Sequence, residues 1–325
     1  MESKDIWVFA EQENGILSET VYELLAEAQK LRKSFGGEVA AVLLGCGVSS
    51  LTDTLAAYGA DKIILAESGA LAVYKPRTYT NALSGLAKKY APSIFLLGAT
   101  AIGRDVAPRV MCALRTGLTA DAVDLSADAD GDFVQTTPGF GGNLLAHICI
   151  PEKRPQMVTV RPGVFSPSIP DNKAYAPVIR EALNIADDAD YEILETVEKS
   201  RSGPSLSDAK IVVACGRGIK SSEDIKLAET LAARIGGVVA CSRPIAESGW
   251  MPHERQIGQS GATVKADYII NIGISGAMQY LSGMQNSKCV ISINTNPTAS
   301  IFDVSQFGAV CDYRKLLPAI IKRLR

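Results

Sequence analysis

The chain has few of the residues on which many active sites depend. It has two histidines, His147 and His253, which argues against a histidine-rich metal site. Aromatic residues make up 6% and the formal net charge is −2, so neither base-stacking platforms nor a basic field points to nucleic acid or to anionic lipid. No apolar run reaches transmembrane length, and the N-terminus lacks the apolar core of a signal peptide. We therefore expect a cytoplasmic protein without stable membrane insertion.

Cysteine is also used sparingly and without pattern. The seven cysteines form no Cys-x-x-Cys pair, and most lie inside apolar runs, which indicates buried thiols in a reducing compartment and no iron–sulfur centre or metal site. No P-loop Gly-Lys-Ser/Thr occurs, and no nucleophile stands beside a base, so His253 is interpreted as a solvated loop imidazole. We predict no catalytic residues. The cysteines are Cys46, Cys112, Cys149, Cys215, Cys241, Cys289 and Cys311.

The length of 325 residues and a hydrophobic fraction of 47% fit two globular domains. Strand and helix patterns alternate up to residue 114, which predicts a parallel sheet covered by helices. Glycines and prolines gather between residues 119 and 163, where we expect antiparallel strands or long connections. The predicted strands are 5–12, 38–44, 62–66 and 93–97, with the β-like runs 144–150 and 156–160; the predicted helices are 18–35, 49–58, 79–90 and 103–114.

Residues 166–185 carry four prolines, which indicates an extended excursion, and residues 186–207 are acidic or polar. We place a domain boundary near residue 200 on this linker composition, which gives domains 1–200 and 201–325. A second alternating block then begins. Its predicted strands are 210–215, 238–241, 267–273, 288–293 and 309–311, and its predicted helices are 222–235, 277–284 and 313–324.

Both domains are thus predicted to be α/β, each a mostly parallel, doubly wound, Rossmann-like sheet, with added β structure in the first. Ligands of such sheets bind beyond the carboxyl ends of the strands. The stretch from Gly249 to Tyr280 has the features of such a place: a polar loop with three glycines, a buried strand, and the turn Gly273–Gly276 before a helix. Main-chain N–H groups in a turn of this kind bind anions, most often phosphate. A nucleotide-like ligand is the resulting hypothesis.

Three further segments each allow a functional and an ordinary interpretation. Gly216-Arg217-Gly218 is part of a dinucleotide fingerprint with Ser221 where the third glycine would be, or a tight turn with a solvated arginine. Ser242-Arg243 is a plain turn, or sets a permanent cation over a ligand. Gln256–Gly261 is a surface loop, or a set of hydrogen-bond donors.

Two strand ends and one turn leave the same choice open. Asn294 and Asp312 either accept hydrogen bonds from ribose hydroxyls or form an Asx turn and a helix cap. In the first domain, Gly98–Pro108 is another strand-to-helix turn, for which we favour a structural or partner-facing role.

Taken together, the motifs of the second block resemble one family, the α subunit of electron-transfer flavoproteins. The resemblance also covers the first domain in strand–helix order, in the turn from Gly98 to Asp105 and in length. It rests on Gly216-Arg-Gly-Ile-Lys-Ser, Ala240-Cys-Ser-Arg-Pro, Gln256-Ile-Gly-Gln-Ser-Gly, Gly273-Ile-Ser-Gly-Ala-Met-Gln and Ile293-Asn-Thr-Asn-Pro, in the order and spacing of the family.

The resemblance implies an electron carrier, not an enzyme with its own substrate. It implies a heterodimer with a β subunit, contacted by the first domain, and one FAD held by the second domain. AMP or a second FAD would lie in the β subunit. Electrons would pass between a flavoprotein dehydrogenase, such as an acyl-CoA dehydrogenase, and another redox partner. An electron-bifurcating system with NADH and ferredoxin stays open.

Carried over by motif, Arg217 and the turn 275–280 would hold the pyrophosphate and ribityl region of FAD. Ser260 would lie near flavin N5 and Arg243 beside the ring, where a fixed cation favours the reduced flavin. Ser242, Asn294 and Asp312 would hold other polar groups. The full predicted set is Arg217, Ser242, Arg243, Gln256, Ile257, Gly258, Gln259, Ser260, Ser275, Gly276, Ala277, Met278, Gln279, Tyr280, Asn294, Asp312 and Tyr313.

One departure from the family stands out, because many members have histidine where this chain has Tyr280. The change removes a cation from the predicted pyrimidine edge of the flavin. Two other functions are weighed against the electron carrier. A nicotinamide-dependent oxidoreductase would need a fuller glycine fingerprint and a proton-handling residue, and neither is visible; a non-redox nucleotide-binding scaffold would be colourless.

Overall fold

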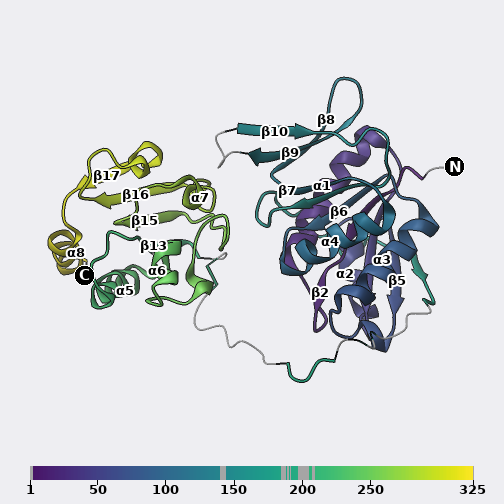
Figure 1. Cartoon of the computed structure of the whole chain (residues 1–325), viewed down its shortest axis with the longest axis horizontal. Helices are drawn as coiled ribbons and strands as arrows, with labels where there is room; N and C mark the ends of the chain where they lie inside the picture. Colours follow the sequence, from purple (N-terminus) through teal and green to yellow (C-terminus); the bar gives the residue numbers. More distant parts are fainter. Residues whose placement is uncertain are drawn as a thin grey trace. The chain divides into compact units, whose positions relative to one another are not determined.

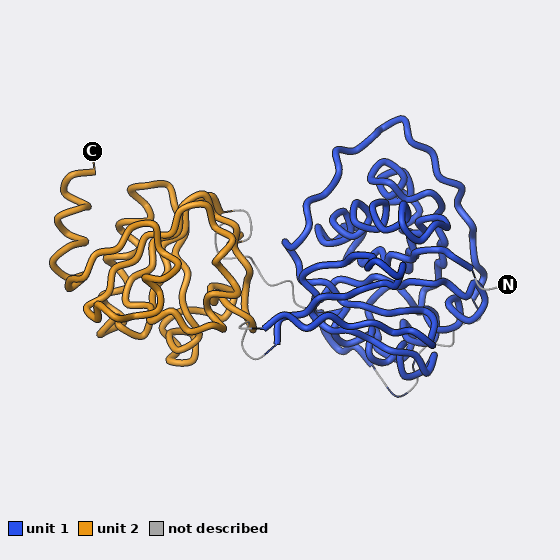
Figure 2. The backbone as a smooth tube through the Cα atoms, turned by 90° about the horizontal axis from the view of Figure 1, so that it is seen from above, with its two compact units in different colours: residues 1–139, 144–196 blue, residues 140–143, 197–325 orange. Residues whose placement is uncertain are grey.

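The structure is a computed structural model that describes residues 3–139, 144–183, 188, 190, 192–196, 205–206 and 209–324. The chain divides into two compact units, residues 1–139 with 144–196 and residues 140–143 with 197–325 (Figure 2). The predicted boundary near residue 200 lies outside the described residues, as do Gly141 and Gly142. In the described part of the chain, no helix is long and apolar enough to cross a membrane, and no three histidine, cysteine or acidic side chains gather as a metal site.

Unit 1 is built on a seven-stranded sheet in the order β12-β5-β4-β1-β6-β11-β7, in which every neighbouring pair is parallel. The pattern of alternating strands and helices is therefore confirmed. The strands are β1 (Ile6–Phe9), β4 (Val39–Gly45), β5 (Lys62–Glu67), β6 (Ile94–Gly98), β7 (Leu118–Ala122), β11 (Gln156–Val160) and β12 (Val178–Arg180).

Two expectations for the middle of the chain need correction. Residues 156–160 are no antiparallel addition or connection: β11 lies inside the parallel sheet between β6 and β7, and all its side chains are buried, as strands covered on both faces require. The excursion 166–185 also supplies the edge strand β12. The added antiparallel sheet is smaller than expected and consists of β8 (Asp124–Ala127), β9 (Phe133–Gly139) and β10 (Leu144–Ile148).

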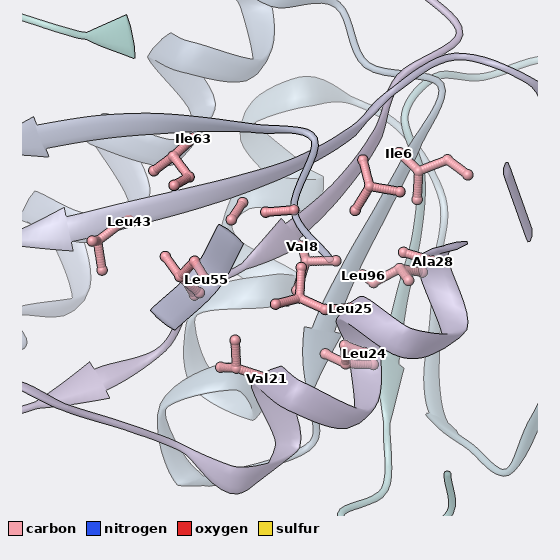
Figure 3. Packing of buried hydrophobic residues seen from close by; sticks show 14 of the residues in the cluster. Ile6, Val8, Val21, Leu24, Leu25, Ala28, Leu43, Leu55, Ile63 and Leu96 are labelled. Atoms are coloured by element: carbon pink, nitrogen blue, oxygen red, sulfur yellow. The ribbon is translucent and has the colours of Figure 1, made fainter. Parts of the chain in front are cut away.

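Helices cover both faces of the large sheet (Figure 1). Val21, Leu24, Leu25 and Ala28 of α1 recur at helical spacing and pack on Ile6 and Val8 of β1, as Figure 3 shows. The helix begins after Ser18, whose backbone is extended, and ends at Gly36. The helices of unit 1 are α1 (Glu19–Phe35) and α2 (Thr52–Ala57) on one face, and α3 (Pro76–Tyr90) and α4 (Ala101–Leu114) on the other.

Unit 2 has a five-stranded sheet, all parallel, in the order β14-β13-β15-β16-β17. Helices α5, α6 and α8 cover one face, while α7 and the loop after residue 256 cover the other. The strands are β13 (Ile211–Cys215), β14 (Val238–Cys241), β15 (Tyr268–Ile272), β16 (Cys289–Asn294) and β17 (Phe307–Val310), and the helices are α5 (Ile225–Ile235), α6 (Arg243–Glu247), α7 (Met278–Leu281) and α8 (Tyr313–Arg323).

Candidate functional site

The carboxyl ends of all five strands of unit 2 lie at one edge of the sheet, because the strands are parallel and in register. From β13 the chain continues to β14 on one side, and β15 lies on the other side, so the order of the strands reverses between β13 and β15. This is where ligands of open α/β sheets bind. The predicted site segments at Gly216, Ser242 and Gly273 each follow one of these strands directly, and Asn294 is the last residue of β16.

The turns after β13 and β15 pack against each other through bare main chain. Gly218 N donates to Gly273 O at 2.9 Å. A Cβ at Gly216 would lie 2.4 Å from Gly273 O, and a Cβ at Gly273, where φ is +63°, would lie 2.8 Å from the Gly218 Cα. The glycines of the partial fingerprint are thus required by the contact between two turns. Arg217, between them, is exposed and has no hydrogen-bond or ion-pair partner among the described residues.

The loop 256–261 lies against α7 and the residues that precede it. Gln259 N donates to Gln279 O at 2.7 Å, and a Cβ at Gly258 would lie 2.8 Å from the same oxygen. Within the loop, Gln256 Nε2 donates to Ser260 Oγ at 2.9 Å. Because Gln256 is buried and Ser260 is exposed, this bond fixes the hydroxyl of Ser260 at the surface beside the turn. The structure therefore brings the predicted loop 256–261 into contact with the predicted segment 275–280.

The turn from Gly273 to Ala277 presents unpaired donors. Among the described residues, no group accepts a hydrogen bond from the main-chain N–H of Ser275, Gly276 or Ala277. The predicted helix 277–284 is shorter than expected, since α7 has four residues and continues as turns. So short a helix has a small dipole, and the anion-binding capacity of this place lies in the three N–H groups themselves.

Two polar residues near the ends of strands, Asn294 and Asp312, form hydrogen bonds with nearby main-chain groups. Asn294 Nδ2 donates to Ile274 O at 2.8 Å, and its Oδ1 accepts from Asn296 N at 3.0 Å. Asp312 Oδ1 accepts from Arg314 N at 2.9 Å and caps α8. Both side chains make the Asx-turn and cap contacts that the sequence also allowed, so their direct role in ligand binding has less support than their role in shaping the edge.

Tyr313 links the first turn to α8. Its hydroxyl donates to Asp224 Oδ2 at 2.8 Å and accepts from Lys220 N at 3.0 Å, and Arg314 Nη2 lies 2.7 Å from the same carboxylate. The Arg314 guanidinium, with help from the Tyr313 hydroxyl, lowers the pKa of Asp224 below its ordinary value against a smaller opposing effect of burial. Tyr313 is itself buried, and its hydroxyl holds the main chain at Lys220, three residues after Arg217, against the start of α8.

The second cation of the predicted set stands at the start of a helix that sequence reasoning missed. Ser242 is buried at the N-cap position of α6, and its side chain makes no capping bond. The Arg243 side chain is 68% exposed and its Nε lies 2.8 Å from Glu247 Oε1. A serine followed two residues later by Pro244 was the available helix-start pattern. Arg243 is therefore a surface cation that one acid partly balances.

Tyr280 faces the core, not the exposed loop. It is 5% exposed, and its hydroxyl donates to Asn271 Oδ1 at 2.6 Å. Neither Asn271 nor its polar neighbours Ser292 and Ser305 was predicted, since single polar residues inside apolar strands give no pattern to recognise.

The matching turn in unit 1 is filled by its own side chains. Thr100 Oγ1 accepts from Gly103 N at 2.9 Å and donates to Glu11 Oε2 at 2.6 Å. Burial raises the pKa of the Glu11 carboxyl, against the opposing effect of the Thr100 bond. The Glu11 carboxyl is thus hydrogen-bonded to the N-cap residue of α4, at the end of the helix that favours an anion.

The edge of unit 2 has the chemistry that a dinucleotide requires. Its free main-chain donors and Arg217 suit phosphate, and its hydroxyl and amide groups suit sugars and heterocycles. The fold and this donor set define a nucleotide-binding α/β protein.

Comparison with known proteins makes the class specific. Residues 6–186 match the electron transfer flavoprotein domain, and residues 205–285 match the electron transfer flavoprotein FAD-binding domain. The chain belongs to the electron transfer flavoprotein alpha-subunit family.

Similar proteins span the full length of the chain. The electron transfer flavoprotein subunit alpha of Thermoanaerobacterium thermosaccharolyticum is 43% identical, over 99% of this chain and 98% of its own. Protein FixB of Clostridium saccharobutylicum is 42% identical, over 99% and 96%. The lactate dehydrogenase (NAD(+),ferredoxin) subunit LctC of Acetobacterium woodii is 38% identical, over 98% of this chain and 76% of its own.

Proposed function

We propose that this chain is the FAD-holding subunit of an electron carrier that has no small-molecule substrate of its own. The observation that supports the proposal best is the turn 275–277, which lies in the region that matches the FAD-binding domain and whose three main-chain donors have no acceptor among the described residues. FAD bound there would supply the redox chemistry. The chain's own part is to hold the cofactor, shield one side of it and set its potential.

Residues with exposed or unpaired polar groups are the ones we propose to face the cofactor. Arg217 and the N–H groups of 275–277 would hold the pyrophosphate, since they combine a permanent cation with fixed donors. Ser260 would donate to or accept from the flavin, and Arg243 would supply positive charge beside it. Asn294, Asp312 and Tyr313 would act by holding the turns in place, as their internal hydrogen bonds suggest.

We further propose a heterodimer with a β subunit that covers strand β10 of unit 1. This strand pairs only with β9 among the described residues, so its other edge is open. Its side chains are exposed except for the half-buried Ile148, with Leu144 at 60% and Leu145 at 59%, and it carries no acidic or basic residue besides His147. Open apolar edge strands are a hazard that proteins normally cover, and a permanent partner would do so.

The names of the relatives support a proposal for the electron partners. We propose a flavoprotein dehydrogenase, such as an acyl-CoA dehydrogenase, as one partner. The name of LctC joins NAD⁺ and ferredoxin, which favours electron bifurcation as a second candidate role for this chain. The β subunit would then hold FAD and not AMP. All seven cysteines are free thiols, which supports work in the cytoplasm. The expectation that most of them are buried was wrong, since only Cys215 and Cys241 are buried.

The test is an absorption spectrum of the chain purified together with its β subunit. Flavin bands that bleach on reduction and remain with the protein through gel filtration are expected. A colourless complex, or one that retains a nicotinamide nucleotide, would refute the proposal. Two flavins per heterodimer would favour bifurcation, and one flavin with one AMP would favour simple electron transfer.

A further inference from the structure

A chain of hydrogen-bonded polar side chains, buried except for the partly buried Ser305, extends from Tyr280 across β15 and β16 of unit 2. Tyr280 Oη donates to Asn271 Oδ1 at 2.6 Å, and Asn271 Nδ2 donates to Ser292 Oγ at 3.3 Å. Ser292 Oγ and Ser305 Oγ are 2.7 Å apart, and Ser305 Oγ donates to Ile301 O at 2.7 Å. Because the Ser305 proton is committed to Ile301, Ser292 is the donor in the pair, and every group passes its hydrogen to the next.

The chain of hydrogen bonds returns to the turn from which it starts. Ile301 N donates to Ser275 O at 3.0 Å. A Cβ at Gly276 would lie 2.1 Å from Ile301 N, so the turn and residue 301 touch through bare backbone. Tyr280 therefore holds one end of the segment 275–280 and Ile301 holds the other, and Asn271, Ser292 and Ser305 connect them through the core.

The composition of the strands agrees with a selected network. Asn271 on β15 and Ser292 on β16 are neighbours in register, and both are fully buried. An amide and a hydroxyl in the middle of two apolar strands cost free energy unless each finds partners. Here both are satisfied, and burial raises the pKa of the Tyr280 phenol well above its ordinary value, so the hydroxyl remains a donor.

We propose that Tyr280 is a positioning residue which, through Asn271, Ser292, Ser305 and Ile301, holds the main-chain donors of residues 275–277 in the arrangement that binds the cofactor's phosphates. The inference rests on the proposed function for its ligand, but the rigidity of the turn is a property of the protein alone. A phenylalanine would fill the same volume and leave the Asn271 oxygen without its donor.

The test compares Tyr280→Phe, Ser305→Ala and the double variant, each in the full chain complexed with the β subunit. Two controls match them. Tyr268→Phe removes a hydroxyl from an exposed tyrosine of β15, and Ile225→Val removes one buried methyl group on the other face of the sheet. The first readout is the rate of amide hydrogen exchange at Tyr280 and Ile301, measured in the flavin-free complex. The Tyr280 amide donates to Ala277 O and the Ile301 amide to Ser275 O. The second is the Kd for FAD.

We expect either network variant to speed exchange at both amides and to raise the Kd about five- to tenfold, the worth of one hydrogen bond. The double variant should exceed neither single variant by much, because one break disconnects the chain. Ser305 stands at the far end of the network from Tyr280, so an effect of Ser305→Ala at the Tyr280 amide is the sharpest support. Neither control should change exchange or Kd.

Unchanged exchange at both amides, effects that add in the double variant, or equal effects in Ile225→Val would overturn the role of Tyr280. A wild-type complex that does not bind FAD would instead refute the proposed function, while the exchange rates would still decide whether the network holds the turn.

Discussion

Gly276 offers a direct test of the backbone contact that shapes the candidate site. Its φ is +91°, and an added Cβ would lie 2.1 Å from Ile301 N and 2.6 Å from the Ser300 carbonyl carbon. Alanine in this backbone region costs about 1–2 kcal/mol. Overlap with main chain that cannot move freely adds about 1–3 kcal/mol. Loss of the bond from Ile301 N to Ser275 O adds about 1 kcal/mol. We therefore expect Gly276→Ala to destabilise unit 2 by about 3–6 kcal/mol.

Gly249 provides the matched control. Its φ is +70°, yet nothing lies within 4 Å of the position that its Cβ would take. Gly249→Ala therefore carries only the conformational cost, about 1–2 kcal/mol. Urea unfolding of the full chain, with hydrogen exchange to assign each transition to its unit, measures both variants. Equal destabilisation by the two alanines would show that the contact between residues 276 and 301 is not made.

Three further predictions concern charge and surface. Arg243→Ala should lower the flavin reduction potential in a redox titration and Glu247→Gln should raise it, while unfolding free energies change by no more than about 0.5 kcal/mol because the pair is exposed; shifts of the same sign would exclude a charge effect. The folded-state pKa of Asp224 is lowered, so its contribution to stability is present above an ordinary carboxyl pKa of about 3.9 and is lost as the pH falls through the lowered value; Asp224→Asn should be less stable than wild type at neutral pH and approach it in acid, and a constant difference across the pH range of urea unfolding would contradict this. Leu145→Glu should weaken binding of the β subunit at least about tenfold in a pull-down titration, whereas Ile169→Glu, on a side chain that is 94% exposed outside any strand, should not; equal losses would remove β10 from the interface.

The sequence was a good guide to the parallel sheets, because buried strands and amphipathic helices of ordinary length differ in period. The sequence was a poorer guide to elements that are short or that lie outside the alternation of strands and helices. Helix α6 is five residues long and follows a proline pattern, and β12 lies in a proline-rich segment. Strand β11 was placed in the wrong kind of structure because glycines and prolines before it suggested an antiparallel addition. Strand β11 pairs with β6 and β7, which are distant in sequence, and no local sequence pattern predicts such pairings.

For the candidate site, motif order indicated the edge of the sheet, and the structure brings residues 256–261 and 273–280 into contact there. The side-chain assignments remain predictions. What spacing could not indicate was the state of each side chain: that Asn294 and Asp312 are engaged with their own turns, or that Tyr280 is turned into the core. These depend on pairings across strands, and such pairings are set by tertiary packing.

The glycines of the motifs serve the packing of the main chain. Glycine at 216, 218 and 273 is explained by two turns in contact, and glycine at 258 by the carbonyl of Gln279. Contacts within the protein explain all four glycines, so a glycine pattern alone does not distinguish a protein that binds a ligand from one that does not. The groups that remain available to a ligand are those without partners among the described residues, namely Arg217 and the N–H groups of 275–277. Binding should therefore depend on these groups, while the glycines should govern stability. Arg217→Ala is expected to weaken FAD without changing the urea midpoint of unit 2, and a variant that lost both together would show that Arg217 belongs to the scaffold.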